Sequence, residues 1–160
     1  MNTLIVFASK HGCTEKCANL LSKELKDKVD VVNLKTTKDI SISQYDKVII
    51  GGSIYIGKIQ KEVTTFCSKN LEKLKGKKIG LFICAGMKED DEINKKISES
   101  FPSELLDIAV VKKHLGGEYY FDKMNFFERF IVKKIAKVSS SQSDISKDNI
   151  SSFAKAINSI

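Results

Sequence analysis

Short apolar runs alternate along the chain with segments whose apolar residues recur at helical spacing. The apolar runs are Thr3–Phe7, Val29–Leu34, Lys47–Gly51, Lys78–Cys84 and Ile108–His114. Short runs rich in Val, Ile and Phe are typical of strands buried on both faces. The helical spacing predicts helices over Thr14–Asp27, Gln60–Lys73, Glu89–Ser100, Lys123–Val138 and Asp148–Ser159, with a linker over Ser139–Ser146.

This alternation predicts an α/β fold in three layers, with five parallel strands and helices on both faces. The 160 residues fit a single domain over 1–160. Ligands of such sheets bind beyond the carboxyl ends of the strands. The loops after the first, third and fourth strands are therefore the candidate binding loops.

Composition favours a compact protein of the cytoplasm. Apolar residues make up 42% of the chain and there is one proline, which argues against disorder. No apolar run is long enough to span a bilayer, and the N-terminus lacks the pattern of a signal peptide.

The four cysteines, Cys13, Cys17, Cys67 and Cys84, show no paired CxxC spacing and are expected to be thiols. Cys13 and Cys17 lie four residues apart with His11 nearby, which resembles part of a metal site. No second pair of ligands lies close in the sequence, so no metal site is predicted.

The loop after the first strand has the residues of an anion site. It includes Ser9, Lys10, His11, Gly12, Cys13 and Thr14, and a helix follows. Backbone N–H groups at a helix N-terminus suit a phosphate, and hydroxyl groups add donors. The loop matches neither the nucleoside-triphosphate nor the dinucleotide glycine motif. The alternative is that Thr14 only caps the helix while Gly12 serves the turn.

The spacing Val6-Phe7-x-Ser9-x-x-Gly12-x-Thr14-x-x-x-Ala18-x-x-Leu21 resembles the flavodoxin signature. The resemblance implies a flavodoxin-like sheet with strand order 2-1-3-4-5 and a bound FMN. It also implies that the residues from Ser9 to Thr14 surround the FMN phosphate.

The same resemblance places the flavin ring at the two other loops. Tyr55, flanked by Ser53, Ile54, Ile56 and Gly57, occupies the place of the aromatic that stacks on the ring in flavodoxins. The Ile56–Gly57 peptide is the candidate to turn its carbonyl toward flavin N5. The alternative is a tyrosine in an ordinary turn.

The loop after the fourth strand has no aromatic residue to cover the other face of the ring. It contains Cys84, Ala85, Gly86 and Met87. Either Met87 covers that face or it stays open to a flat substrate or quinone, unless Tyr119 or Tyr120 folds over it.

The lysines behind the net charge of +7 are mostly dispersed among acidic residues, but one stretch near the C-terminus is different. Lys123–Lys137 combines phenylalanines and isoleucines with basic residues at helical spacing. It is expected either to cover the sheet with a basic outer face or to contact an anionic membrane surface or an acidic partner. No nucleic-acid motif accompanies the charge.

The stretch Gly116–Val138 and the segment Ile50-Gly51-x-Ser53-Ile54-x-x-Gly57 resemble the flavodoxin-type bacterial protoporphyrinogen oxidases. This resemblance implies an oxidoreductase, peripheral at the inner face of the membrane, that passes electrons from a reduced substrate through FMN to a quinone. The alternative is a non-enzymatic electron carrier between proteins. No catalytic acid or base is predicted, because the cofactor does the chemistry.

Overall fold

The computed structural model describes residues 1–10, 12–87, 89–119 and 142–160. Five parallel strands form the central sheet in the order β2-β1-β3-β5-β6. They are β1 (Asn2–Ala8), β2 (Lys28–Asn33), β3 (Lys47–Tyr55), β5 (Lys78–Cys84) and β6 (Val111–His114). Strand β4 (Lys58–Ile59) adds an antiparallel sixth strand to β3. When the five parallel strands alone are numbered in chain order, β5 and β6 become the fourth and fifth strands. The order is then the predicted 2-1-3-4-5, so the α/β fold class is confirmed.

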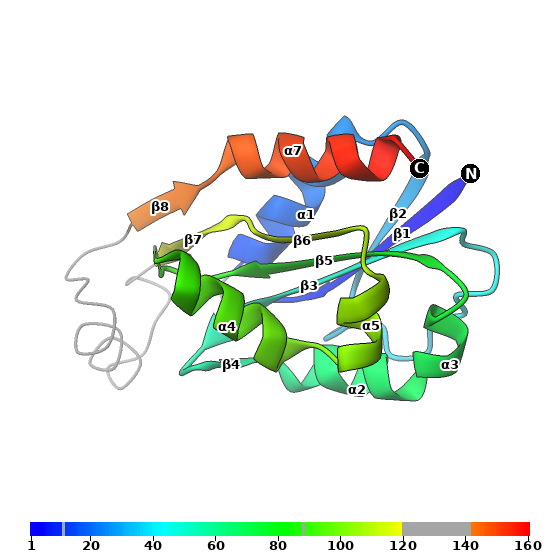
Figure 1. The fold of residues 1–160 in the computed structure, drawn as a ribbon, viewed down its shortest axis with the longest axis horizontal. Coiled ribbons are helices and arrows are strands. Elements are labelled where there is room, and N and C mark those ends of the chain that lie inside the picture. Colours follow the sequence, from blue (N-terminus) through cyan, green and yellow to red (C-terminus); the bar gives the residue numbers. More distant parts are fainter. Residues whose placement is uncertain (11, 88, 120–141) are drawn as a thin grey trace.

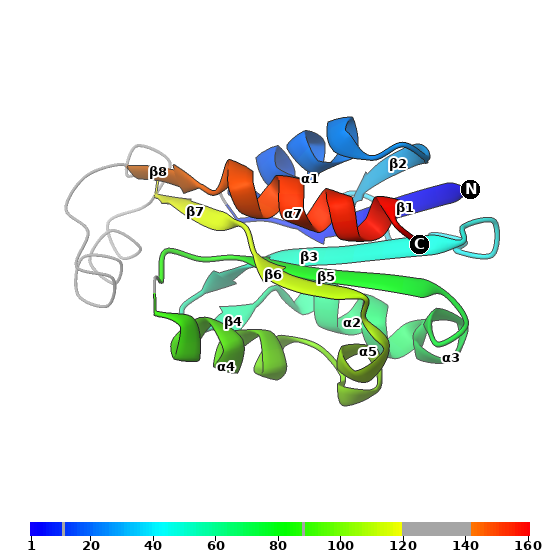
Figure 2. The ribbon, with the colours of Figure 1, turned by 45° about the horizontal axis from the view of Figure 1, so that its top comes forward.

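Helices cover both faces of this sheet (Figures 1 and 2). One face carries α1 (Cys13–Glu24) and α7 (Lys147–Asn158). The other face carries α2 (Lys61–Lys69), α3 (Leu71–Leu74), α4 (Asp90–Ser100) and α5 (Ser103–Ile108). Within the described residues, no helix combines the length and apolar character that crossing a membrane requires.

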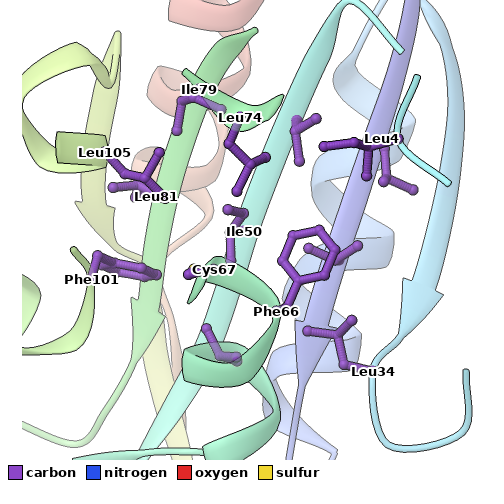
Figure 3. Close-up of a cluster of buried hydrophobic side chains, with 14 of the residues drawn as sticks. Leu4, Leu34, Ile50, Phe66, Cys67, Leu74, Ile79, Leu81, Phe101 and Leu105 are labelled. Carbon is purple, nitrogen blue, oxygen red and sulfur yellow. The ribbon is translucent and has the colours of Figure 1, made fainter. Parts of the chain in front are cut away.

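The sheet has an apolar core on each side because its central strands are buried on both faces. Figure 3 shows the core under α2 and α3, where Phe66 and Cys67 pack against Ile50. On the opposite face, the rings of Phe82 and Phe153 meet edge to face, with centroids 6.1 Å apart. Alternate residues of β5 therefore serve the two cores in turn.

The strand register brings the carboxyl ends of the three central strands to one edge. Ala8 pairs with Gly52, and Ser53 pairs with Cys84. The loops that follow β1, β3 and β5 therefore begin side by side, as the sequence predicted.

An antiparallel ribbon lies at this same end of the molecule (Figures 1 and 2). It consists of β7 (Gly116–Tyr119) and β8 (Gln142–Ile145). The predicted linker over Ser139–Ser146 is wrong for residues 142–145, which form β8. The ribbon joins the core where the Ser146 N–H donates to the Leu115 carbonyl at 3.0 Å.

Other boundaries also differ from the prediction. The third strand continues past Gly51 to Tyr55, so Ser53, Ile54 and Tyr55 belong to β3 rather than to a loop. The fifth strand begins at Val111 rather than Ile108, because Ser103–Ile108 forms α5. The predicted helix Gln60–Lys73 is divided at Asn70, which has a φ of −111° and a ψ of 10°. The Asn70 side chain donates to the Phe66 carbonyl at 3.0 Å and so competes with the helical backbone bonds.

Candidate functional site

The loop after β1 is held by a hydrogen bond within itself. The Ser9 hydroxyl accepts from the Gly12 N–H at 2.9 Å. Gly12 is the N-cap of α1 and has a φ of 95°, a conformation that costs glycine little. Apart from its two chain neighbours, no atom of the described residues lies within 4 Å of the position that a Cβ would take at Gly12. The loop therefore presents open space directly at the start of the helix.

The first turn of α1 lacks a side-chain cap among the described residues. Its first helical hydrogen bond runs from the Lys16 N–H to the Gly12 carbonyl at 3.1 Å. Thr14 lies inside the helix rather than at the cap, so the capping alternative for Thr14 is wrong. The positive end of the helix dipole remains available to an anion.

The Thr14 hydroxyl is buried and has no hydrogen-bond partner in the described part of the chain. Such a group loses its bonds to water on folding without replacing them, which costs about 1–3 kcal/mol. An orphaned donor in the first turn of α1, two residues after Gly12, fits a phosphate-type ligand. Ser9, Gly12 and Thr14 together therefore make up the candidate anion site.

After β3, the chain makes a two-residue hairpin into β4. Ile54 pairs with Ile59 and Tyr55 with Lys58, which leaves Ile56 and Gly57 in the turn. Both have a positive φ, 50° and 78°, as a type I′ turn requires. A β-branched residue rarely adopts this conformation, so the backbone at Ile56 is strained.

Tyr55 links this hairpin to the first loop. The Lys10 ammonium lies 5.1 Å from the centroid of the Tyr55 ring, within the range of a cation–π contact. The Lys96 ammonium of α4 donates to the Gly57 carbonyl at 3.1 Å. The hairpin is therefore held by contacts with the first loop and with α4.

A side chain that the sequence did not single out, Gln60, holds the end of β3. Its amide oxygen accepts from the Ser53 N–H at 2.9 Å, and its amide nitrogen donates to the Ser53 hydroxyl. A Cβ on Gly52 would stand 2.7 Å from the Ile59 side chain and 3.1 Å from the Gln60 amide oxygen. Gly52 is therefore required for this close packing.

The loop after β5 is supported by β6 and the ribbon. His114 Nε2 donates to the Ala85 carbonyl, and the Ala85 N–H donates to the Gly116 carbonyl at 2.9 Å. A Cβ on Gly117 would stand 2.6 Å from the Ala85 carbonyl group. The loop is therefore shaped by the Gly116-Gly117 pair that follows β6.

The structure brings the three predicted loops to one edge, with different roles for their side chains. Cys13 and Cys84 are buried, with 6% and 2% of their surface exposed, and both side chains belong to the apolar core on the α1 face of the sheet. Gly86 and Met87 are half-buried. His11, Tyr120 and the basic stretch Lys123–Lys137 lie outside the described residues, as does the side chain of Tyr119.

The positions of Gln60 and His114 could not be found from the sequence. Each acts by reaching a backbone group of a neighbouring loop, and neither belongs to a motif. The nearest signal was Gly116-Gly117, whose close approach to Ala85 requires small residues.

Comparisons with known proteins agree with this architecture. Protoporphyrinogen IX dehydrogenase [quinone] of Escherichia coli (strain K12) is 25% identical over 174 residues, covering 98% of this chain and 94% of the relative. Flavodoxin 2 from Bacillus cereus superposes with a TM-score of 0.59 at 19% identity, covering 99% of both chains. Fusobacterium nucleatum flavodoxin bound to flavin mononucleotide superposes with a TM-score of 0.53 at 16% identity, covering 99% of this chain and 97% of that one.

The family model described as a flavodoxin domain matches residues 4–146. These residues include all three loops at the carboxyl edge and the strands that position them. The chain therefore belongs to the flavodoxin family.

Proposed function

We propose that the carboxyl-edge site binds FMN, with the phosphate at the loop Ser9–Thr14. The observation that carries this proposal is the buried Thr14 hydroxyl, which has no hydrogen-bond partner among the described residues and lies in the helix turn that follows Gly12. A phosphate would accept hydrogen bonds from the Thr14 and Ser9 hydroxyls and from the first N–H groups of α1. Membership of the flavodoxin family and the FMN-bound Fusobacterium relative support this choice of ligand.

The remaining two loops would hold and orient the flavin ring. FMN, when bound, supplies the reversible uptake of electrons. The half-buried Tyr55 offers an aromatic face, and the Ile56–Gly57 turn presents backbone groups that Lys96 fixes. Ala85, Gly86 and Met87 offer backbone groups and a flexible thioether side chain, with no aromatic ring.

We further propose that the protein is an FMN-dependent oxidoreductase that takes electrons from a protoporphyrinogen-type substrate and passes them to a quinone. The alignment with the E. coli dehydrogenase along nearly the whole chain supports this reading. The lack of an aromatic residue in the Cys84–Met87 loop also supports it, because a flat substrate needs access to the cofactor. Peripheral membrane contact through Lys123–Lys137 and a cytoplasmic location belong to the same proposal.

The first experiment is the visible spectrum of the purified protein, with the released chromophore identified. We expect about one FMN per chain. A colourless protein that cannot be reconstituted with FMN would contradict the cofactor proposal.

The second experiment is anaerobic turnover of protoporphyrinogen IX with a soluble menaquinone analogue as acceptor. We expect quinone-dependent formation of protoporphyrin. A flavin-loaded protein that shows no turnover and takes up electrons singly in a reductive titration would instead be an electron carrier. Vesicles containing anionic lipids, compared with neutral vesicles in a sedimentation assay, test the membrane contact.

A further inference from the structure

Three cysteines that are distant in the sequence meet beneath the first loop. Cys13 and Cys17 lie one turn apart on α1, and Cys84 ends β5 on the same face of the sheet. Their sulfur atoms all lie within 4.8 Å of one another. The sequence disfavoured a metal site because no further ligand follows Cys17 closely. The fold supplies that ligand from a strand 67 residues later.

We propose that Cys13, Cys17 and Cys84 bind one soft, thiophilic metal ion, with Cu(I) as the closest match. Thiolate sulfur is the ligand that selects soft ions such as Cu(I) and Zn²⁺. Metal–sulfur bonds of about 2.3 Å in a trigonal plane place the sulfur atoms about 4 Å apart. The observed limit of 4.8 Å would therefore require each sulfur to move by at most about 0.5 Å.

The geometry favours a three-coordinate ion over a tetrahedral one. The three side chains are 6%, 0% and 2% exposed, so water has little access to a fourth position. The Cys17 thiol donates to the Leu115 carbonyl at 3.9 Å, which is a weak oxygen contact. Zn²⁺ in structural sites takes four ligands, whereas Cu(I) is stable with three thiolates.

The surroundings act on the three thiols in opposite directions. Cys13 is the first residue of α1, and the N-terminus of a helix favours a negatively charged sulfur. Hydrogen bonds with the Cys13 and Cys17 thiols, together with burial, raise the pKa of Cys84 well above its ordinary value. The metal must therefore displace these protons, and its binding strengthens as pH rises.

A fourth cysteine provides a matched control. Cys67 is also fully buried, but it lies in the core on the opposite face of the sheet (Figure 3). An effect of general thiol chemistry would involve Cys67 equally, whereas the proposed site would not.

The test loads the full chain, reduced and under anaerobic conditions, with Cu(I) in the presence of a Cu(I) chelator, and measures the copper retained after desalting. We expect about one copper per chain. Cys13→Ala, Cys17→Ala and Cys84→Ala should each weaken binding at least 10- to 100-fold, the loss that even second-shell changes cause. Cys67→Ala should bind as the unaltered protein does. Equal retention in all four variants, or none in the unaltered protein, would overturn the proposal.

X-ray absorption of the copper-loaded, unaltered chain tests the proposal without any variant that has to fold. We expect three sulfur neighbours at about 2.3 Å. A first shell dominated by nitrogen or oxygen, or one with two sulfurs only, would overturn it.

Discussion

The Lys47 ammonium lies 2.8 Å from the Asp27 carboxylate at the edge of the sheet opposite to the candidate site. The same ammonium donates to the Ile157 carbonyl at 3.0 Å, and the Thr3 hydroxyl donates to Asp27 at 2.9 Å. The Lys47 side chain is 2% exposed and the Asp27 side chain 17%. This ion pair therefore joins β1, β3 and the C-terminal helix through a buried charge.

The unequal burial predicts unequal effects of removing each partner. Asp27→Asn leaves a buried ammonium unpaired, and we expect it to lower the free energy of unfolding by about 3 kcal/mol. Lys47→Met leaves a carboxylate that can reach water, and its effect should be less than half as large. Urea unfolding at pH 7 measures both. A larger loss for Lys47→Met would contradict this account.

The pair also predicts a pH dependence. The hydrogen bond from Lys47 lowers the pKa of Asp27 below its ordinary value of 3.8. A carboxyl group whose pKa is lower in the folded state stabilises the fold above its unfolded-state pKa. That contribution is lost as pH falls through the folded-state pKa. The stability difference between the unaltered protein and Asp27→Asn should therefore be constant above about pH 5 and shrink below 3.8.

Thr14→Val is predicted to have opposite effects on FMN binding and on stability. Loss of a hydrogen bond to a charged phosphate costs about 1.5–3 kcal/mol, which should weaken FMN binding roughly 10- to 100-fold. In the flavin-free protein the hydroxyl has no partner among the described residues, so its replacement by a methyl group should leave stability unchanged or raise it. Flavin fluorescence titration and thermal unfolding measure the two effects.

Thr14→Ser is the control, because it keeps the hydroxyl and should bind FMN within a few-fold of the unaltered protein. If Thr14→Val binds FMN as tightly, Thr14 does not contact the phosphate.

The order of strands and helices could be predicted because each buried strand is a continuous apolar run. The fifth strand was placed too early for an identifiable reason. Ile108 and Val110 are apolar yet 39% and 40% exposed, so they extend the apolar run without belonging to the sheet. The strand β8 could not be predicted, because the residues Gln142–Ile145 are mostly polar and are paired only through β7.

The candidate site likewise contains residues whose place could be predicted from the sequence and contacts that could not. Gly12 and Thr14 could be predicted because the loop and the helix start are adjacent in the sequence. The contact between His114 and Ala85 joins residues 29 positions apart, and the approach of Cys84 to Cys13 joins residues still farther apart. Both depend on the strand register, which the apolar pattern does not define for side chains at strand ends.

The strained turn after β3 predicts that Ile56→Gly stabilises the protein. Ile56 has a φ of 50° and is 50% exposed, so its side chain gains little from burial. Glycine removes a strain of about 1–2 kcal/mol at the expense of some chain entropy. We expect a net gain of about 0.5–1 kcal/mol by urea unfolding.

The neighbouring position is the matched control for this prediction. Gly57 has a φ of 78°, so Gly57→Ala should destabilise the same turn by about 1 kcal/mol. If Ile56→Gly destabilises the protein as much as Gly57→Ala, the side chain of Ile56 makes a stabilising contact that outweighs its strain.

Adding a single methyl group at Gly51 is predicted to lower stability much more than the changes at positions 56 and 57. A Cβ at this position would stand 2.0 Å from Cζ of Phe82, which lies fully buried on the neighbouring strand. Because the core is close-packed, Gly51→Ala must displace the Phe82 ring, and we expect a loss of at least about 3 kcal/mol. Gly76→Ala is the control, since its Cβ would come no nearer than 3.7 Å to a neighbouring atom.

A double-mutant cycle with Phe82→Leu separates steric conflict from backbone strain. Leucine is shorter than phenylalanine and leaves space over Gly51. If the conflict is steric, Gly51→Ala should cost at least about 1 kcal/mol less in the Phe82→Leu background than in the unaltered protein. Additive losses in the cycle would mean that the glycine is required by the backbone itself, and the close packing of Phe82 would then not explain why position 51 lacks a side chain.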